Sequence, residues 1–189
     1  MERGGRESFR QILIRFCAPT LAGLKCSNMM SCLITGEILQ EMELVRAELI
    51  KKGVLIDILY QTPDRMLILV YRKSALAEIL KTNVYQQFLR EFGYCDFECV
   101  HALRRLKARI AADGGQFPHE IGVFLGYPLE DIRGFIENKG RNGLCCGDWK
   151  VYHEPEKAKK MFAKLQKCRD VYIRLFQDGR SVMQLTVPV

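Results

Sequence analysis

The chain has 189 residues, the length of one domain, and its 48% hydrophobic and 27% charged residues are typical of globular proteins. This composition argues against disorder, collagen-like repeats and a coiled coil. No apolar run approaches the roughly 20 residues that cross a bilayer. Arg10 and Arg15 interrupt the apolar N-terminal stretch, where a signal peptide carries no charge. We therefore expect a single domain over residues 1–189 that is cytoplasmic and has no membrane partner.

Positive charge exceeds negative charge, with 29 Lys and Arg against 22 Asp and Glu, a net charge of +7 and a pI of about 9.0. Such a balance favours nucleic acids or other anions as partners. The positive residues gather, however, at 104–109 and 157–169, in two groups that are typical of solvated helix faces. The basic pI is therefore interpreted as surface charge.

Hydrophobic periodicity organises the first half of the chain. It predicts a helix over residues 7–17, closed or restarted by Pro19, and a second helix over 36–52, ended by Gly53. Two runs rich in Leu, Ile and Val, joined by a short Pro-Asp loop, then predict a β-hairpin over 54–71. Because these runs are nearly continuous, both faces of the sheet should be covered.

The second half of the chain is mostly helical in pattern. Helices are expected over residues 74–80, 83–92, 97–112, 118–126 and 129–138. A strand near 149–153 follows, and then one long helix over 158–176, for which two strands split at 169–170 are the alternative. The expected fold class is α+β, with a small antiparallel sheet made of the hairpin 54–71 plus the strand near 149–153. This sheet would pack among about six to seven helices.

Eight cysteines would indicate disulfides in a secreted protein, but no secretion signal accompanies them, so free thiols in a reducing cell are expected. They are Cys17, Cys26, Cys32, Cys95, Cys99, Cys145, Cys146 and Cys168. Only Cys95 and Cys99 approach the paired spacing of zinc sites, with His101 nearby. Small buried apolar side chains are the preferred interpretation of this pair.

Three stretches together resemble a known family: CAPTLAGLK at residues 17–25, FPHEIGVFLGYP at 117–128 and CCGDWKVY at 145–152. The family is an uncharacterised domain of unknown function found mainly in clostridia and related anaerobic Firmicutes. The resemblance covers nearly the whole chain and brings no activity with it. Relatives that lie near flavodoxin and ferrous-iron transport genes imply a redox or iron-linked role.

Cys17 and His119 form the candidate catalytic pair of a cysteine-nucleophile enzyme. A nucleophilic cysteine needs a lowered pKa, which a helix N-terminus or an imidazole supplies. Cys17 lies where a new helix can begin, and His119 starts a helix beside Glu120. Asp148 or Asn142 would orient the imidazole, in the chain order of some thiol hydrolases. The alternative is a core cysteine and a surface histidine.

Four cysteines are candidate metal ligands, with His119 as a further donor: Cys17, Cys145, Cys146 and Cys168. Thiolates suit iron and zinc, and haem iron also accepts them, so iron, zinc and haem are the cofactors considered. Their spacing matches no known cluster signature. The preferred interpretation is a Cys/His pocket that handles a metal or a redox cofactor linked to iron, and whether the protein is an enzyme stays open.

Residues 119–139 have the pattern of a helix-turn-helix, which makes nucleic-acid binding a third hypothesis. The second helix of this pattern begins Leu129-Glu130-Asp131, and its carboxylates would be repelled by phosphates. This argues against DNA as the partner.

Further candidate binding residues surround these positions: Lys25, Glu120, Tyr127, Trp149 and Lys150. Trp149 and Tyr127 are equally explained as core aromatics. The loop 143–150 is Gly-rich and polar and has two thiols, which is more typical of a site than of packing. We therefore expect the three family stretches to converge on one thiol-bearing pocket for a small molecule or a metal.

Overall fold

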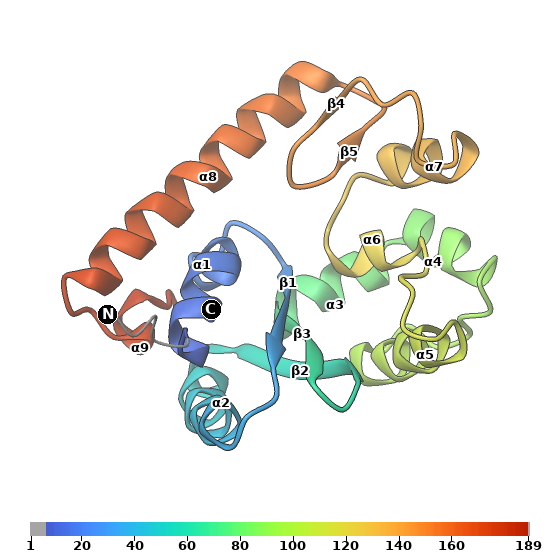
Figure 1. Cartoon of the computed structure of the whole chain (residues 1–189). Helices are drawn as coiled ribbons and strands as arrows, with labels where there is room; N and C mark the ends of the chain where they lie inside the picture. The colour runs from blue at the N-terminus through green and yellow to red at the C-terminus, as the bar shows by residue number, and fades with distance from the viewer. Residues whose placement is uncertain (1–6, 189) are drawn as a thin grey trace.

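A computed structural model describes residues 7–188, and the chain forms an α+β fold, as predicted (Figure 1). The helices are α1 (Phe9–Leu21), α2 (Gly36–Leu49), the 3-10 helix η1 (Ile50–Lys52), α3 (Lys73–Lys81), α4 (Asn83–Arg90), α5 (Cys99–Ala112), α6 (Ile121–Phe124), α7 (Leu129–Glu137), α8 (Pro155–Gln177) and α9 (Val182–Leu185). The strands are β1 (Ser27–Leu33), β2 (Val54–Gln61), β3 (Arg65–Arg72), β4 (Cys145–Cys146) and β5 (Lys150–Val151). Most predicted helices end within about three residues of their observed bounds, whereas only 121–124 of the predicted helix 118–126 are helical.

The main sheet is antiparallel in the order β1-β3-β2, so the predicted hairpin β2–β3 is confirmed and gains a third strand that was not predicted. Ser27 of β1 lies opposite Tyr71 of β3. The β1 sequence, SNMMSCL, has no β-branched or aromatic residue, so pairing with β3 decides its conformation rather than local propensity. The strand expected near 149–153 does exist at Lys150–Val151, but it pairs with β4 in a separate two-stranded sheet.

The main sheet separates two hydrophobic cores. Alternate residues of β3 face opposite sides, and Ile68 packs into a core with α1 and α2 whereas Leu69 packs into a core with the helices from α3 to α7. Both faces of the sheet are therefore covered, which explains the nearly continuous apolar runs of the hairpin.

Helix α1 does not end at Pro19, contrary to the sequence-based expectation. It begins at a capping box formed by Ser8 and Gln11 and continues through Pro19 to Leu21. The proline lacks only the N–H that would bond to the carbonyl four residues earlier. The next turn still closes, because the backbone N–H of Ala22 donates to Ala18 O at 2.8 Å and that of Leu24 donates to Pro19 O at 2.8 Å.

Helix α8 is the long C-terminal helix that the periodicity predicted, and it runs beside α1 (Figure 1). The β4–β5 hairpin lies near its N-terminal part (Figure 1). Among the described residues, no helix is both long enough and apolar enough to cross a membrane. The arrangement of α1, β1, α8 and the hairpin defines the hollow that forms the candidate site.

Candidate functional site

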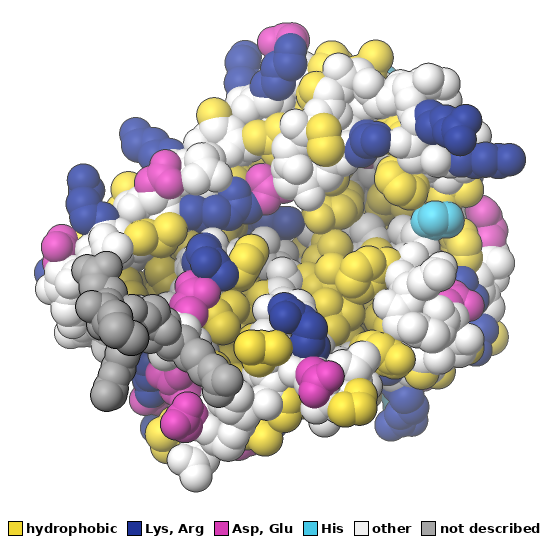
Figure 2. Space-filling model, in the orientation of Figure 1, with side chains coloured by type: hydrophobic (Ala, Val, Ile, Leu, Met, Phe, Trp, Pro, Cys, Tyr) yellow, Lys and Arg dark blue, Asp and Glu magenta, His cyan; other side chains and the backbone are white. Residues whose placement is uncertain are grey.

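A cavity of about 760 Å³ opens between α1, β1, α8 and the β4–β5 hairpin. Its polar lining consists of Arg15, Lys25, Asn28, Asp148, Gln166 and Arg169. Its apolar and aromatic lining includes Phe16, Met29, Leu125, Tyr127, Phe162 and Ile173. Figure 2 shows this face hollowed, with hydrophobic side chains inside and Lys and Arg side chains at the edge. The lining has three cationic side chains and one carboxylate, and Arg15 also pairs with Glu7 at 2.8 Å. One cation is therefore left over for an anion.

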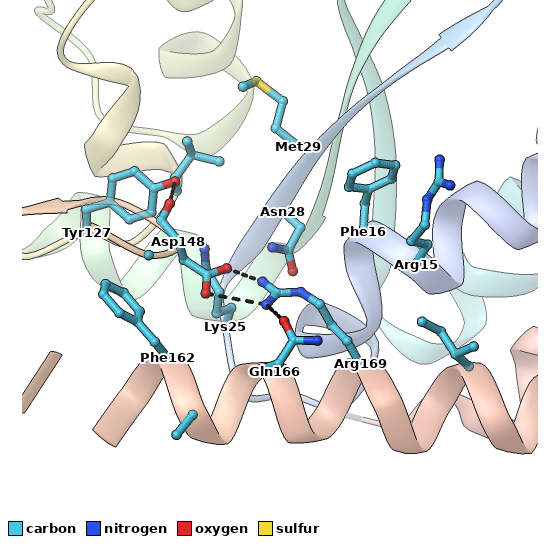
Figure 3. A pocket seen from close by; sticks show the side chains of 14 residues that line it. Arg15, Phe16, Lys25, Asn28, Met29, Tyr127, Asp148, Phe162, Gln166 and Arg169 are labelled. Carbon is cyan, nitrogen blue, oxygen red and sulfur yellow. Dashed lines mark hydrogen bonds and ion pairs between the residues drawn. The ribbon is translucent and has the colours of Figure 1, made fainter. Parts of the chain in front are cut away.

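Asn28 presents a hydrogen-bond donor to the cavity. Its side chain is only 6% exposed, and its Oδ1 accepts hydrogen bonds from the Thr20 backbone N–H at 3.2 Å and from Thr20 Oγ1 at 2.7 Å. Because a backbone N–H only donates, the amide oxygen must face Thr20 and the NH₂ group must face the other way. The Asn28 amide nitrogen lies on the side of Lys25 and Asp148 (Figure 3) and has no hydrogen-bond partner among the described residues.

Lys25 extends into the same space from the turn between α1 and β1. It makes no ion pair or hydrogen bond with any residue between 7 and 188, and its Nζ lies 4.9 Å from the centroid of the Tyr127 ring. Burial lowers the pKa of the Lys25 amine, Arg169 acts in the same direction, and the carboxylate of Asp148 opposes the shift. The Lys25 residue is thus half-buried, and its amine is a donor without a protein acceptor in the described part of the chain.

Arg169 of α8 is held by Asp148 at the tip of the hairpin. The two guanidinium nitrogens contact the two carboxylate oxygens, with Nη1 lying 3.4 Å from Oδ2, and Gln166 Oε1 also lies 3.4 Å from Nη1 (Figure 3). The Arg169 side chain is 18% exposed and the Asp148 side chain is 13% exposed. Asp148 therefore neutralises Arg169 locally and leaves Lys25 as the cation without a partner at the cavity.

Aromatic side chains form the wall behind these groups. The ring of Trp149 packs 5.2 Å from that of Tyr127 and edge-on at 4.6 Å from that of Phe162. The Tyr127 hydroxyl donates to the Asp148 carbonyl oxygen at 3.0 Å. A Cβ atom on Gly147 would lie 2.2 Å from Phe162, so only glycine allows the hairpin tip to approach α8 this closely.

Asp131 of α7 holds the β4–β5 hairpin in place through hydrogen bonds, a structural role that the sequence did not indicate. It is 3% exposed and accepts hydrogen bonds from Trp149 Nε1 at 2.7 Å and from the backbone N–H groups of Tyr152 at 2.7 Å and His153 at 2.9 Å. The Asp131 carboxylate therefore has a structural role, because its hydrogen bonds join α7 to the hairpin. Asp131 lies in the first turn of α7, and α6 is only four residues long, so a helix-turn-helix at 119–139 would have a first helix of about one turn.

Cys17 lies in the core and not in the cavity. Its side chain is 0% exposed among the apolar residues of α1, and burial raises the pKa of its thiol, although Lys25 and Arg169 act in the opposite direction. The position is not the start of a new helix, since α1 runs continuously through it. The two features that would activate a nucleophilic thiol, an adjacent helix N-terminus and a lowered pKa, are therefore both missing at Cys17.

We expect the Cys17 thiol to react with iodoacetamide at neutral pH at least about 100-fold more slowly than the exposed Cys146, because only an accessible thiolate reacts. The raised pKa keeps the thiol protonated at neutral pH, so the rate should rise only when the pH is well above neutral. Peptide mass spectrometry measures the reaction rates of both thiols, and these rates should become similar when the protein is unfolded in urea. Equal rates in the folded protein would contradict the burial of Cys17.

His119 and Glu120 lie away from Cys17. The His119 ring packs 5.5 Å from the Phe135 ring and lines a second, mainly apolar cavity of about 410 Å³, together with Tyr127, Trp149 and Lys150. Glu120 is fully buried, where it pairs with Arg109 and accepts a hydrogen bond from the Tyr94 hydroxyl at 3.3 Å. Lys150 Nζ donates to the carbonyl oxygen of Gly140 at 2.7 Å. Glu120 and Lys150 therefore have structural partners.

The four thiols considered as metal ligands do not form a ligand set. Cys145 and Cys146 lie on β4, whereas Cys168 lies on α8 and is buried, as Cys17 is on α1. Within residues 7–188, no group of three or more His, Cys, Asp or Glu side chains is placed to hold a metal ion. The alternative zinc site, made of Cys95, Cys99 and His101, is likewise not among the metal-binding groups of residues 7–188. His101 pairs instead with Asp96.

The three family stretches nevertheless meet at the large cavity, through Lys25, Tyr127 and Asp148, but none of the described cysteines lines it, so the expected thiol-bearing pocket is wrong in its thiols. Asn28, Phe162 and Arg169 also line the cavity and were not predicted as site residues. Asn28 lies in β1, which has no local strand signal, and the other two lie in the long helix α8. No curated protein and no solved structure was found to match the chain. A family model does match it over residues 13–186, so the chain belongs to the family described as "Protein of unknown function (DUF3793)".

Proposed function

We propose that the protein binds a small organic anion, a carboxylate or a phosphate ester, in the cavity between α1, β1, α8 and the hairpin. The observation that carries this proposal is the pair of donors at the cavity, Lys25 Nζ and Asn28 Nδ2, which have no protein acceptor among the described residues. Neither donor is fully enclosed by the described part of the chain, so both can be reached from the cavity. An anionic group between them would accept from both.

The apolar part of the lining favours an organic ligand over an inorganic ion. Phe16, Met29, Tyr127 and Phe162 line the cavity together with the two donors. Ligand sites commonly combine such apolar walls with a few placed polar groups. A redox cofactor with acidic groups, such as haem with its propionates, belongs to this chemical class. An iron-linked role would then depend on the basic cavity and not on cysteine ligands.

Two substitutions test the donor pair directly. Asn28→Asp keeps the oxygen that accepts from Thr20 but replaces the NH₂ group by a second oxygen, so it should repel an anion. Lys25→Met removes the charge and keeps the length of the side chain. Each hydrogen bond to a charged group contributes about 1.5–3 kcal/mol, so we expect affinity to fall about 10- to 100-fold in either variant.

Binding is measured by thermal shift and by fluorescence of Trp149, which is the only tryptophan and packs against two lining residues. The panel contains aromatic and aliphatic carboxylates, phosphate monoesters and haem. Lys164→Met is the matched control, because Lys164 lies exposed on α8 outside the cavity lining. If no member of the panel binds, or if Lys25→Met binds as tightly as Lys164→Met, the proposed site is wrong.

A further inference from the structure

Lys25 combines three features that matter for covalent chemistry. Lys25 is half-buried and lines a cavity large enough for a small molecule, its amine has no ion-pair partner among residues 7–188, and a donor for an anion, Asn28 Nδ2, lines the same space. The contact recorded for the amine is with the Tyr127 ring, 4.9 Å from Nζ, and this contact leaves the N–H groups free to bind a ligand. This face of the molecule is hollowed (Figure 2). Lys25 lines the cavity, so a ligand that enters it can reach the amine.

We propose that Lys25 forms a protonated imine with an aldehyde or keto acid whose carbonyl group lies next to its carboxylate. This inference rests on the proposed function, because the carboxylate would occupy the anion site at Asn28. The carboxylate then accepts from Asn28 Nδ2, and the adjacent carbonyl carbon faces Lys25 Nζ. The Tyr127 ring, 4.9 Å from Nζ, limits the approach from one side.

The charges around Lys25 are compatible with both states of the reaction. Burial favours the neutral, nucleophilic amine, and so does Arg169, whereas the carboxylate of Asp148 acts in the opposite direction. The protonated imine has the same charge as the ammonium group that it replaces. The bound carboxylate therefore keeps its cationic neighbour after the covalent bond has formed.

The step is balanced without an oxidant or a reductant. The lone pair of the neutral Lys25 nitrogen forms a bond to the carbonyl carbon, and the carbonyl π electrons move to the oxygen. The oxygen takes up two protons and leaves as water, while the nitrogen lone pair forms the C=N bond. Overall, an ammonium group and a carbonyl group give an iminium group and water, and hydrolysis reverses the reaction.

The test uses glyoxylate, a small aldehyde with a carboxylate, together with cyanoborohydride. Reduction of the imine leaves a carboxymethyl group on the lysine, which peptide mass spectrometry assigns to a position. Because the cavity holds the reactants together, we expect Lys25 to be modified at least about tenfold faster than Lys164, an exposed lysine of the same molecule. Propionaldehyde, which lacks the carboxylate, should not show this preference.

Two variants separate this inference from the proposed function. Lys25→Arg keeps the positive charge and should still bind unreactive carboxylates, but it cannot form the imine. Asn28→Asp keeps the amine and should lose the preference for glyoxylate. If Lys25 is modified no faster than Lys164 while carboxylates still bind, the imine is wrong and the anion site stands. If carboxylates do not bind and Lys25 shows no preference, both are wrong.

Discussion

Replacing Arg72 by methionine is expected to lower the free energy of unfolding by about 3 kcal/mol. Arg72 ends the central strand β3 and is only 5% exposed. Its guanidinium group donates to the carbonyl oxygens of Thr20 at 2.7 Å, Leu21 at 2.7 Å and Val187 at 2.8 Å, which ties the sheet to the end of α1 and to the C-terminal segment. Methionine fills much of the space but donates nothing.

The expected loss lies below the sum of three charged hydrogen bonds because two of the acceptors keep a second donor. Thr20 O also accepts from the Gly23 N–H at 3.1 Å, and Leu21 O accepts from the Val187 N–H at 3.0 Å. Urea unfolding followed by circular dichroism measures the change. Arg104→Met, at an exposed position of α5, is the control and should change stability by less than about 0.5 kcal/mol.

The free energy of unfolding of Arg72→Lys is expected to lie between those of the unsubstituted protein and Arg72→Met. The ammonium group keeps the charge near the carbonyl end of α1 but cannot reach three separate carbonyl oxygens with the geometry of the guanidinium group. If Arg72→Met were as stable as Arg104→Met, the three hydrogen bonds would contribute nothing net. Burial of the Arg72 guanidinium group, which has no carboxylate partner among the described residues, would then not stabilise the fold.

The helices and the hairpin were predictable because their signals are local. Periodic apolar residues predicted α2 and α8, and the Pro-Asp turn between two β-rich runs predicted β2 and β3. Strand β1 was missed because its signal is not local: the sequence SNMMSCL becomes a strand through pairing with β3. The end expected at Pro19 was wrong because a proline near the end of a helix removes only one hydrogen bond.

The candidate site was partly predictable. The three stretches that suggested a site do meet, but they contribute Lys25, Tyr127 and Asp148 to the cavity, while Cys17 packs into the core. The type of a residue indicates which chemistry its side chain can perform, whereas burial decides whether a ligand can reach that side chain. Burial depends on contacts between segments that are distant in the sequence. Arg169 illustrates the limit: it lies in a basic run of α8, and only its approach to Asp148, 21 residues away, distinguishes it from its exposed neighbours.

Replacing Asp131 by alanine is expected to lower the free energy of unfolding by about 4 kcal/mol, because three donors lose a charged acceptor at a buried position. Trp149 Nε1 and the backbone N–H groups of Tyr152 and His153 have no other acceptor among the described residues. Chemical unfolding measures the loss of stability. The emission of Trp149 should shift to longer wavelength, because the indole would become hydrated as the hairpin loosens.

Glu130→Ala separates this effect from the loss of a negative charge at the start of α7. Glu130 occupies the same helical turn and is exposed, so its removal should cost less than about 1 kcal/mol and leave Trp149 emission unchanged. Asp131→Asn retains an acceptor oxygen and should show an intermediate loss. If Asp131→Ala destabilises the protein but anion binding remains, the hairpin position does not control the cavity. Because Asp148 and Trp149 both depend on the hairpin, we expect binding and stability to fall together in Asp131→Ala.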